Sequence, residues 1–191
     1  MFTRTIRTAV SLLLAMTLLT GIVYPVAITG ISKLLFPHQA EGSLVSRDAK
    51  LIGSTLIGQN FSNPKYFWGR PSATAPQPYN GIASSGSNLG PLNQALIDNV
   101  KANVKALHAA DPGNALPIPV DLVTASASGL DPEISIAGAR YQAHRVARAR
   151  HLSPAQVETL IATHETGRLL GFIGEPRINV LVLNLALDSL R

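Results

Sequence analysis

Serine is the residue type whose placement in this sequence first suggests chemistry, because a serine between glycines can act as a nucleophile. Residues 86–90 read Gly-Ser-Asn-Leu-Gly. A nucleophile elbow instead needs Gly-x-Ser-x-Gly at a turn from a strand into a helix, and no Ser-x-x-Lys motif opens a predicted helix. Serines in glycine-rich stretches usually satisfy backbone groups in turns. We therefore expect structural roles for Ser84, Ser85, Ser87, Ser126 and Ser128.

Metal and acid–base chemistry have no visible scaffold either. The five histidines, at positions 38, 108, 144, 151 and 164, include no His-x-x-x-His pair and no His-Glu-x-x-His helix. The acidic residues are scattered singly, which disfavours a paired-carboxylate site, and no Walker-type phosphate loop occurs. The chain has no cysteine, which excludes disulfides and thiolate metal sites. We expect neither a catalytic residue nor a metal site.

The segment YFWGRPSATAPQPYNGIASSGSN, residues 66–88, is the remaining candidate for a functional site. It combines three adjacent aromatic residues, an arginine and a run of small polar residues, and it contains no acid. Trp68 and Arg70 are of the residue types that dominate protein interfaces. Two interpretations stay open: the segment docks onto a partner, or its aromatic residues anchor the core while residues 69–71 turn the chain.

The elements that would position this segment begin with a region poor in helix signals. Residues 34–90 are rich in Gly, Ser, Pro and Asn, and apolar fragments such as LIGSTLIG (51–58) predict short strands between turns. From Pro91 to about residue 110, leucine and valine recur at helical spacing, which predicts an amphipathic helix. The alternation in residues 119–125 predicts a short strand.

Further elements are predicted toward the C-terminus. Residues 131–133 (Asp-Pro-Glu) combine a capping carboxylate, a proline and an acid, which predicts a helix from there to about Arg150. Ser153 with Gln156 three residues later forms a capping box that starts a second helix. Residues 178–182 are rich in β-branched side chains, and a short terminal helix is expected after them.

The N-terminus is predicted to be a membrane anchor. Between Arg7 and Lys33 lie 25 residues without a charge, and as a helix they would extend roughly 37 Å and cross a bilayer with some tilt. A cleaved signal peptide has an apolar core of only about 7 to 15 residues and a small-x-small cleavage site. Here apolar residues continue to Ile28 without such a site, so we expect a retained helix.

The charges around this span predict its orientation. Arg4 and Arg7 precede it with no acid nearby, so the positive-inside rule places the N-terminus in the cytoplasm. The expected fold class is α/β, with a single N-terminal transmembrane helix (residues 1–34, including the cytoplasmic end) followed by one extracytoplasmic mixed α/β domain (residues 35–191). Without residues 1–33, the basic surplus falls from five to two. The high pI therefore says little about nucleic acid.

Two residues inside the span suggest a helix contact. Pro25 removes a backbone hydrogen bond and crowds the carbonyl of Gly21, which predicts a kink. Gly21 also lets another backbone approach closely, and Thr17 and Thr20 lie on the preceding turn. Two interpretations stay open. The patch packs against a partner helix, or the helix is a lipid-facing anchor with an incidental kink.

Four arginines, Arg140, Arg145, Arg148 and Arg150, form the densest basic cluster. A nucleic-acid-binding helix would look similar, but the expected placement outside the cytoplasm removes that partner. We expect a solvated helix face, with contact to anionic lipid or to an acidic partner as the alternative.

Seven segments carry a resemblance to a known family. They are GIVYP (21–25), LIGQNF (56–61), YFWGRPSATA (66–75), PYN (78–80), SGSNLGP (85–91), VTASASGLDPEIS (123–135) and INVLVLNLALD (178–188). Through these segments the chain resembles, from end to end, the KdpC family, the C subunits of Kdp-type potassium-transporting P-type ATPases.

The resemblance implies a non-catalytic, single-pass subunit of a bacterial inner-membrane complex. Its partners would be a channel-like subunit that selects potassium and a subunit that hydrolyses ATP, besides the membrane itself, with no nucleic acid. ATP and potassium would be handled by the complex, without a cofactor bound directly by this chain. Residues 56–91 would dock onto the outer face of the potassium-selective subunit. The subunit-interface candidates are Gly21, Tyr24, Pro25, Asn60, Phe61, Trp68, Arg70, Pro71, Ser72, Tyr79, Asn80, Ser87, Asn88, Ser126, Ser128 and Asp131.

A nucleotide role is also described for the family, whose members are regarded as catalytic chaperones that raise the ATP affinity of the ATPase subunit. LSPAQ (152–156) is faintly similar to the Leu-Ser-Gly-Gly-Gln signature of ABC transporters, which makes Ser153 and Gln156 nucleotide-binding candidates. Pro154 and Ala155 replace the glycines that would let backbone approach phosphate. The capping box explains the same residues without nucleotide, and the expected topology places ATP on the other side of the membrane.

Two alternatives from other functional classes stay open. A membrane-anchored extracytoplasmic serine hydrolase would use Ser126 or Ser128 as its nucleophile and react with a fluorophosphonate probe. A stand-alone ligand-binding module would be functional as a monomer without other subunits. The subunit interpretation instead predicts co-purification with a large multispan protein.

Overall fold

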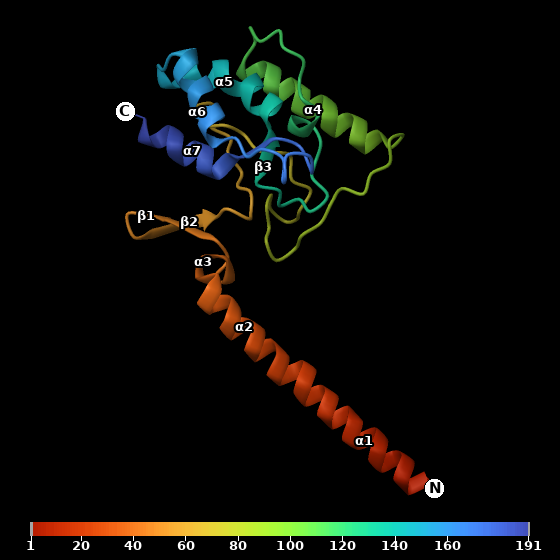
Figure 1. Ribbon diagram of the computed structural model, residues 1–191. Helices are drawn as coiled ribbons and strands as arrows, with labels where there is room; N and C mark the ends of the chain where they lie inside the picture. Colours follow the sequence, from red (N-terminus) through yellow and green to blue (C-terminus); the bar gives the residue numbers. More distant parts are fainter. Residues whose placement is uncertain (1, 191) are drawn as a thin grey trace. The chain divides into compact units, whose positions relative to one another are not determined.

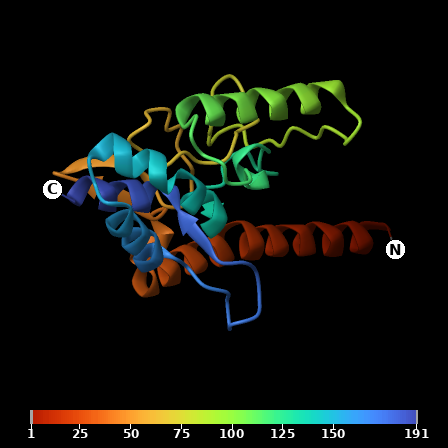
Figure 2. The same cartoon turned by 90° about the horizontal axis from the view of Figure 1, so that it is seen from above.

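A computed structural model describes residues 2–190 (Figures 1 and 2). The chain divides into two compact units between Ile52 and Gly53, and each unit is described here by itself. Helices and short strands are both present, which confirms the predicted mixture of element types. The division into residues 1–34 and 35–191 stays a prediction.

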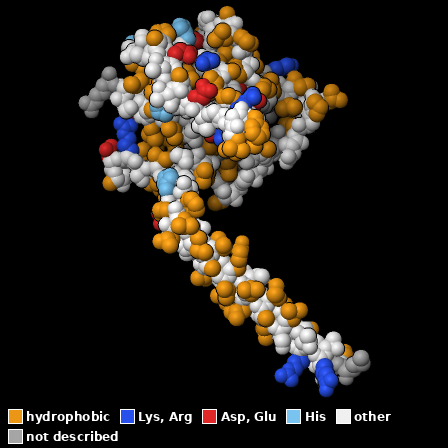
Figure 3. Space-filling model, in the orientation of Figure 1, with side chains coloured by type: hydrophobic (Ala, Val, Ile, Leu, Met, Phe, Trp, Pro, Cys, Tyr) orange, Lys and Arg blue, Asp and Glu red, His pale blue; other side chains and the backbone are white. Residues whose placement is uncertain are grey.

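The first unit begins with one long apolar helix. α1 (Phe2–Leu18), a π-helical turn η1 (Leu19–Val23) and α2 (Tyr24–Leu35) follow one another without a break over 34 residues, and an 18-residue window within them has a mean hydropathy of 2.0. α1 and α2 contain no buried residue. Figure 3 shows hydrophobic side chains along the whole helix and basic side chains at its free end. This helix is long and apolar enough to cross a membrane, as the sequence predicts.

Pro25 coincides with an irregular turn in this helix. The N–H of Tyr24 donates to the carbonyl of Leu19, five residues earlier, which defines the π-helical turn. Pro25 follows at once, in the first turn of α2, where its missing N–H removes one donor from the ladder. The sequence located the disturbance, and the structure gives it the form of a π turn.

A short hairpin follows the long helix, and its second strand ends two residues beyond Ile52. After α3 (Pro37–Ala40), β1 (Leu44–Arg47) pairs with β2 (Lys50–Ser54), and Asp48 and Ala49 at the tip both have positive φ, as a primed two-residue turn requires. β2 confirms a strand in the first half of LIGSTLIG. From residue 55 to residue 93 the chain forms neither helix nor strand, so the further strands expected before residue 90 are wrong.

The second unit is built around three helices and a short sheet. α5 (Ile136–Arg150), α6 (Pro154–His164) and α7 (Val180–Ser189) pack with β3 (Glu133–Ser135), which runs antiparallel to β4 (Arg177–Asn179). A longer helix, α4 (Gln94–Ala110), contributes Leu107 to the core. The largest fully buried apolar side chains are Phe67, Val146, Val157, Ile161, Ile178, Leu183 and Leu187.

One predicted strand and the predicted start of one helix are wrong, whereas that helix does end at Arg150 as expected. Residues 119–125 contain a 3₁₀ turn, η2 (Val120–Leu122), in place of a strand. Its Asp121 accepts the N–H of Ser135 at 2.7 Å and so holds the turn beside β3. Asp131 accepts the N–H of Glu133 as a helix cap would, but residues 133–135 then pair with β4. Ser135 caps α5 instead, through the N–H of Gly138.

Other predicted boundaries are closer to the structure. The capping box is confirmed, because Ser153 Oγ accepts the N–H of Gln156 and the Gln156 side chain accepts the N–H of Ser153. The helix expected from Pro91 begins at Gln94, after an Asn cap. The β-rich run at 178–182 is strand only to Asn179, whose side chain then caps α7 by accepting the N–H of Val182.

Candidate interaction site

The irregular segment after residue 55 and one side of α4 border a cleft of about 320 Å³. α4 and the turn that follows it contribute Asn103, Ala106, Leu107 and Leu122 to its lining. Three of the segments that carry the resemblance line the opposite side. They contribute seven of the predicted interface residues: Asn60, Phe61, Trp68, Arg70, Pro71, Ser72 and Tyr79. The structure thus brings together seven interface candidates that the sequence marks in separate places.

The aromatic part of the segment is fixed by two buried amide side chains. Asn184 of α7 accepts the N–H of Phe67 at 2.8 Å and donates to its carbonyl at 2.9 Å. Gln142 of α5 does the same for Trp68, at 2.8 and 3.1 Å. Each amide therefore replaces a neighbouring strand for one residue. Phe67 is fully buried, so the core interpretation of the aromatic residues is confirmed for it.

Arg145 of α5 also holds the aromatic segment in place. It is 3% exposed, and its guanidinium lies 4.3 Å from the centre of the Trp68 ring. It donates to the carbonyls of Pro64 and Tyr66 and to the Gln142 side chain. Burial lowers the pKa of Arg145 to about 10, with Asp111 opposing and Arg148 adding to this shift, so it stays charged at neutral pH.

The predicted solvated arginine face is therefore half wrong. Arg140 and Arg148 have more than half of their side chains exposed, as expected. Arg150 is 16% exposed, pairs with Asp188 at 2.5 Å and lies over the ring of Tyr66. The helical spacing of four arginines did not distinguish the two that point inward, because their partners are carbonyls 80 residues or so away in the chain.

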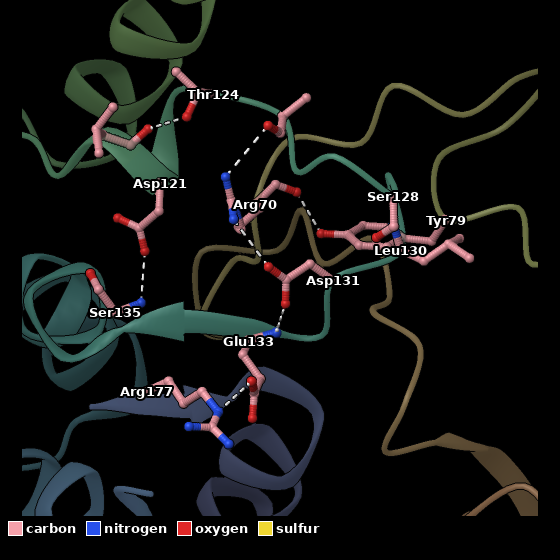
Figure 4. A network of polar contacts seen from close by, with 12 residues as sticks. Arg70, Tyr79, Asp121, Thr124, Ser128, Leu130, Asp131, Glu133, Ser135 and Arg177 are labelled. Atoms are coloured by element: carbon pink, nitrogen blue, oxygen red, sulfur yellow. Dashed lines mark hydrogen bonds and ion pairs between the residues drawn. The ribbon is translucent and has the colours of Figure 1, made fainter. Parts of the chain in front are cut away.

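Beyond Trp68 the chain enters a polar network, which Figure 4 shows. Arg70 forms an ion pair of 3.0 Å with Asp131 and reaches the carbonyl of Ala125 at 3.4 Å. The Arg70 and Asp131 side chains are 25% and 29% exposed. On the other side of the network Glu133 pairs with Arg177 at 2.7 Å. The interface candidates Arg70 and Asp131 are therefore already engaged with each other within the unit.

Tyr79 closes the wall of the cleft behind Arg70. Its hydroxyl donates to the carbonyl of Arg70 at 2.5 Å, and its ring lies against Gly58 and Gly69. A Cβ on Gly69 would come within 2.6 Å of the Tyr79 hydroxyl oxygen, so another residue there would displace that hydroxyl. Burial, and next the charge of Asp131, raise the pKa of Tyr79 to about 12, against an opposing effect of Arg70.

The loop between Pro71 and Tyr79 is held by its own hydroxyl groups. Ser72 Oγ accepts the N–H of Tyr79 at 2.9 Å and donates to the carbonyl of Gly129 at 2.6 Å. Thr74 Oγ1 accepts the N–H of Asn80 at 3.0 Å and donates to the carbonyl of Gln77 at 2.7 Å. Asn80 is buried and thus belongs to the support of the loop.

The serine candidates occupy structural positions beside this loop. Ser126 is buried, and Ser128 Oγ accepts the N–H of Leu130. The Ser128 carbonyl accepts from Ser84 and Ser85, which ties residues 84–86 to residues 126–129. Ser87 is exposed and lines a second hollow of about 240 Å³ that shares Pro71, Ser72 and Asn103 with the cleft. The neighbouring Asn88 is also exposed and has a positive φ.

The remaining candidates do not join the cleft. Gly21, Tyr24 and Pro25 belong to the first unit, where each is exposed. Ser153 and Gln156 are exposed on α6 and bond to each other. Among residues 2–190, no group of three or more His, Asp or Glu side chains is arranged to hold a metal.

Sequence reasoning missed the two amides and the buried arginine that hold the aromatic segment. A signal existed for Asn184, which is a lone amide inside the apolar run VLVLNLAL. Gln142 lies one turn before Val146 and hence on the buried side of α5. A polar side chain on a buried helical face needs a partner, and here the partners are backbone groups.

Comparisons with known proteins extend over almost the whole chain. Residues 6–189 match the family described as KdpC, K+-transporting ATPase, c chain. The chain is 63% identical over 184 residues to the "Potassium-transporting ATPase KdpC subunit" of Dechloromonas aromatica, covering 96% of both proteins. It is 63% identical over 185 residues to the protein of that name from Herminiimonas arsenicoxydans, covering 97% of both, and 64% identical over 184 residues to that of Variovorax paradoxus, covering 96% and 95%.

Proposed function

Because the chain belongs to the KdpC family of potassium-transporting ATPase subunits, we propose that it is a non-catalytic accessory subunit that stabilises an ATP-driven potassium uptake complex. Its partners are the channel-like subunit that selects potassium and the subunit that hydrolyses ATP. This chain contributes an anchor and a docking surface, and the complex handles ATP and potassium.

The anchor half of the proposal places the chain in the bacterial inner membrane. The helix from Phe2 to Leu35 is apolar and unburied, and the only charged residues in it are Arg4, Arg7 and Lys33. The two arginines at one end favour a cytoplasmic N-terminus by the positive-inside rule. The second unit then lies outside the cytoplasm. Gly21, inside the π-helical turn, offers a place where a helix of a partner subunit can approach closely.

The docking half rests on one observation, the cleft that gathers seven candidates from three family segments. Its walls are fixed before any partner arrives, because Trp68, Arg70 and Tyr79 are held by Arg145, Asp131 and the Arg70 carbonyl. A rigid concave surface loses little conformational entropy on binding. We propose that the potassium-selective subunit inserts a side chain or loop tip here, against the exposed Asn60 and the aromatic wall.

The same contacts support a non-catalytic role over a hydrolase. A serine nucleophile needs a base within hydrogen-bond reach. Ser128 Oγ instead accepts the Leu130 N–H, and the Nδ1 atoms of His144 and His164 face Asp111 and the Leu160 carbonyl. A stand-alone ligand-binding module would use the same cleft, and co-purification with the other subunits distinguishes the two.

An effect on ATP affinity, if this subunit has one, is proposed to be indirect. The Ser153 and Gln156 side chains satisfy each other in the capping box, and proline and alanine lie between them. In the proposed topology this turn and ATP are on opposite sides of the membrane. The coupling would then pass through the contacts that this chain makes with its partner subunits.

Assembly of the complex tests the docking surface. Asn60→Trp adds bulk in the cleft at an exposed position, and we expect it to reduce recovery of the other subunits in a pull-down through this chain. Thr163→Trp, at an exposed position of α6 outside the cleft, is the matched control and should leave recovery unchanged. Equal recovery with both variants, at equal folded stability, would contradict docking at the cleft.

A further inference from the structure

The connection between α6 and β4 carries the most concentrated exposed apolar side chains of the second unit. Leu169, Leu170, Phe172 and Ile173 are 63%, 76%, 72% and 46% exposed. In Figure 2 the blue loop that leads into the β4 arrow projects away from the other elements of its unit. Other strongly exposed apolar residues, such as Ile82 and Leu92, are isolated from one another in the sequence. We call residues 168–175 the apolar hairpin.

The apolar hairpin is a folded structure. Leu169 and Ile173 exchange two backbone hydrogen bonds of 2.9 Å, and the N–H groups of Gly171 and Phe172 donate to the carbonyls of Arg168 and Leu169. Leu170 and Gly171 have φ of 54° and 83°, as the two central residues of a type I′ turn require, and three residues separate the bridged pair. The donors at the tip are thus largely satisfied inside the hairpin. This lowers the cost of moving its backbone out of water.

The charges of the apolar hairpin are kept away from its tip. Arg168 and Glu175 pair at 2.7 Å where the two arms begin, with side chains 44% and 80% exposed. The residues between this pair, 169–174, read Leu-Leu-Gly-Phe-Ile-Gly and contain no polar side chain. An apolar tip above a charged base matches the gradient of polarity from the acyl region of a bilayer to its headgroups.

We propose that the apolar hairpin inserts its tip into the outer surface of the lipid bilayer, as a second membrane contact besides the N-terminal helix. This rests on the anchor proposed above, which keeps the second unit permanently within reach of lipid. A protein partner is the less suitable occupant, because stable interfaces bury about 800 Å² per partner. Four side chains on a turn are too small for that, and leucine is under-represented among residues that dominate protein interfaces.

The absence of cysteine makes a direct test possible. Three single-cysteine variants of the full chain, Phe172→Cys, Ile82→Cys and Leu14→Cys, are labelled with an environment-sensitive fluorophore. They are then reconstituted without other subunits into vesicles of phosphatidylethanolamine and phosphatidylglycerol. Lipids that carry a nitroxide on the acyl chain quench only labels that enter the bilayer. The exposed Ile82 serves as the control in water and Leu14 as the control in the anchor.

We expect the label at position 172 to show blue-shifted emission and a loss of fluorescence approaching that at position 14, with no loss at position 82. Quenching at 14 without quenching at 172 would overturn the hairpin insertion and leave the anchor standing. No quenching at 14 would overturn the anchor as well. A label at 172 that stays in water in these vesicles, and becomes protected only when the other subunits are added, would assign the hairpin to a protein partner.

Discussion

Two apolar segments of the second unit, the aromatic segment Tyr66–Trp68 and the apolar hairpin, have opposite fates. The first contains the tryptophan and precedes the arginine that are typical of interfaces, yet Phe67 is fully buried and Trp68 is stacked on Arg145. The tip of the second, residues 169–173, consists of leucine, glycine, phenylalanine and isoleucine, which are typical of cores, yet its side chains are exposed to solvent. Residue type alone therefore misplaces both.

The two segments differ in the groups that form hydrogen bonds with their backbone N–H and carbonyl groups. The aromatic segment has no strand beside it, so Asn184 and Gln142 supply the hydrogen bonds and draw it into the core. The apolar hairpin forms its backbone hydrogen bonds within its own turn, and none of the backbone hydrogen bonds among residues 2–190 joins its tip to the rest of the unit. Buried polar groups must be paired, whereas exposed apolar ones are only unfavourable. The hydrogen-bond partners of the backbone thus decide which apolar segment is buried.

Removing an amide that holds the aromatic segment should have the largest effect. Asn184→Leu leaves both the N–H and the carbonyl of Phe67 buried without a partner, and we expect the free energy of unfolding to fall by about 3 kcal/mol. Urea unfolding of the full chain in detergent, followed by the fluorescence of Trp68, the only tryptophan, measures it. Asn99→Leu, at an exposed position of α4, is the control. Equal small losses would mean that the segment is not held by its amides.

Weakening the arginine clamp should cost somewhat less. Arg145→Lys keeps the charge but loses the planar fork that reaches two carbonyls, Gln142 and the Trp68 ring at once. We expect a loss of about 2 kcal/mol and a red shift of Trp68 emission. Arg140→Lys on the exposed face of the same helix should change both by little. A Trp68 spectrum unaltered by Arg145→Lys would contradict the stacking.

The hydroxyl of Tyr79 should contribute about 1 kcal/mol through its bond to the Arg70 carbonyl, and Tyr79→Phe removes it. The pKa of Tyr79 is raised to about 12, above the usual 10. The neutral form is therefore favoured by folding, and its stabilisation is complete below about pH 10 and lost between pH 10 and 12. The wild-type chain should lose stability more steeply than Tyr79→Phe across this window. Parallel curves would show that Tyr79 does not titrate as a buried group.

Substitution in the apolar hairpin should have the smallest effect on folding. Phe172→Ser removes an exposed side chain, so we expect the free energy of unfolding in detergent to change by less than about 0.5 kcal/mol. Phe67→Ser, the matched change in the buried segment, should cost several kcal/mol, roughly 3 to 5. A large loss at Phe172 would mean that its ring packs against the unit after all, and the contrast between the two segments would disappear.

The sequence predicted the elements that local rules decide. The apolar span, α4, and the capping box of Ser153 and Gln156 each depend on residues within one helix, and each is present. The predictions failed where a distant group competes. Asp131 carries a good capping carboxylate, but β4, more than 40 residues later, recruits residues 133–135 into a sheet. Asp121 similarly holds a 3₁₀ turn where alternation suggested a strand.

The candidate site shows the same division. The segments of the family resemblance marked Asn60, Trp68, Arg70 and Tyr79, and the cleft brings them together. Their partners could not be predicted, because Arg145 and Asn184 reach back by 79 and 117 residues in the chain. Single-residue patterns carry no information about such pairings. The apolar hairpin drew no prediction at all, since exposure follows from the packing of everything around it.

The side of the membrane on which the second unit lies tests the central proposal most directly. Thr163→Cys places one thiol at an exposed position of α6, outside the segment that is expected to dock, in a chain without other cysteines. In intact cells with a permeabilised outer membrane, a maleimide that cannot cross the inner membrane should label this thiol fully. Labelling only after the inner membrane is opened would place the unit in the cytoplasm and contradict the proposed anchor, docking surface and hairpin contact together.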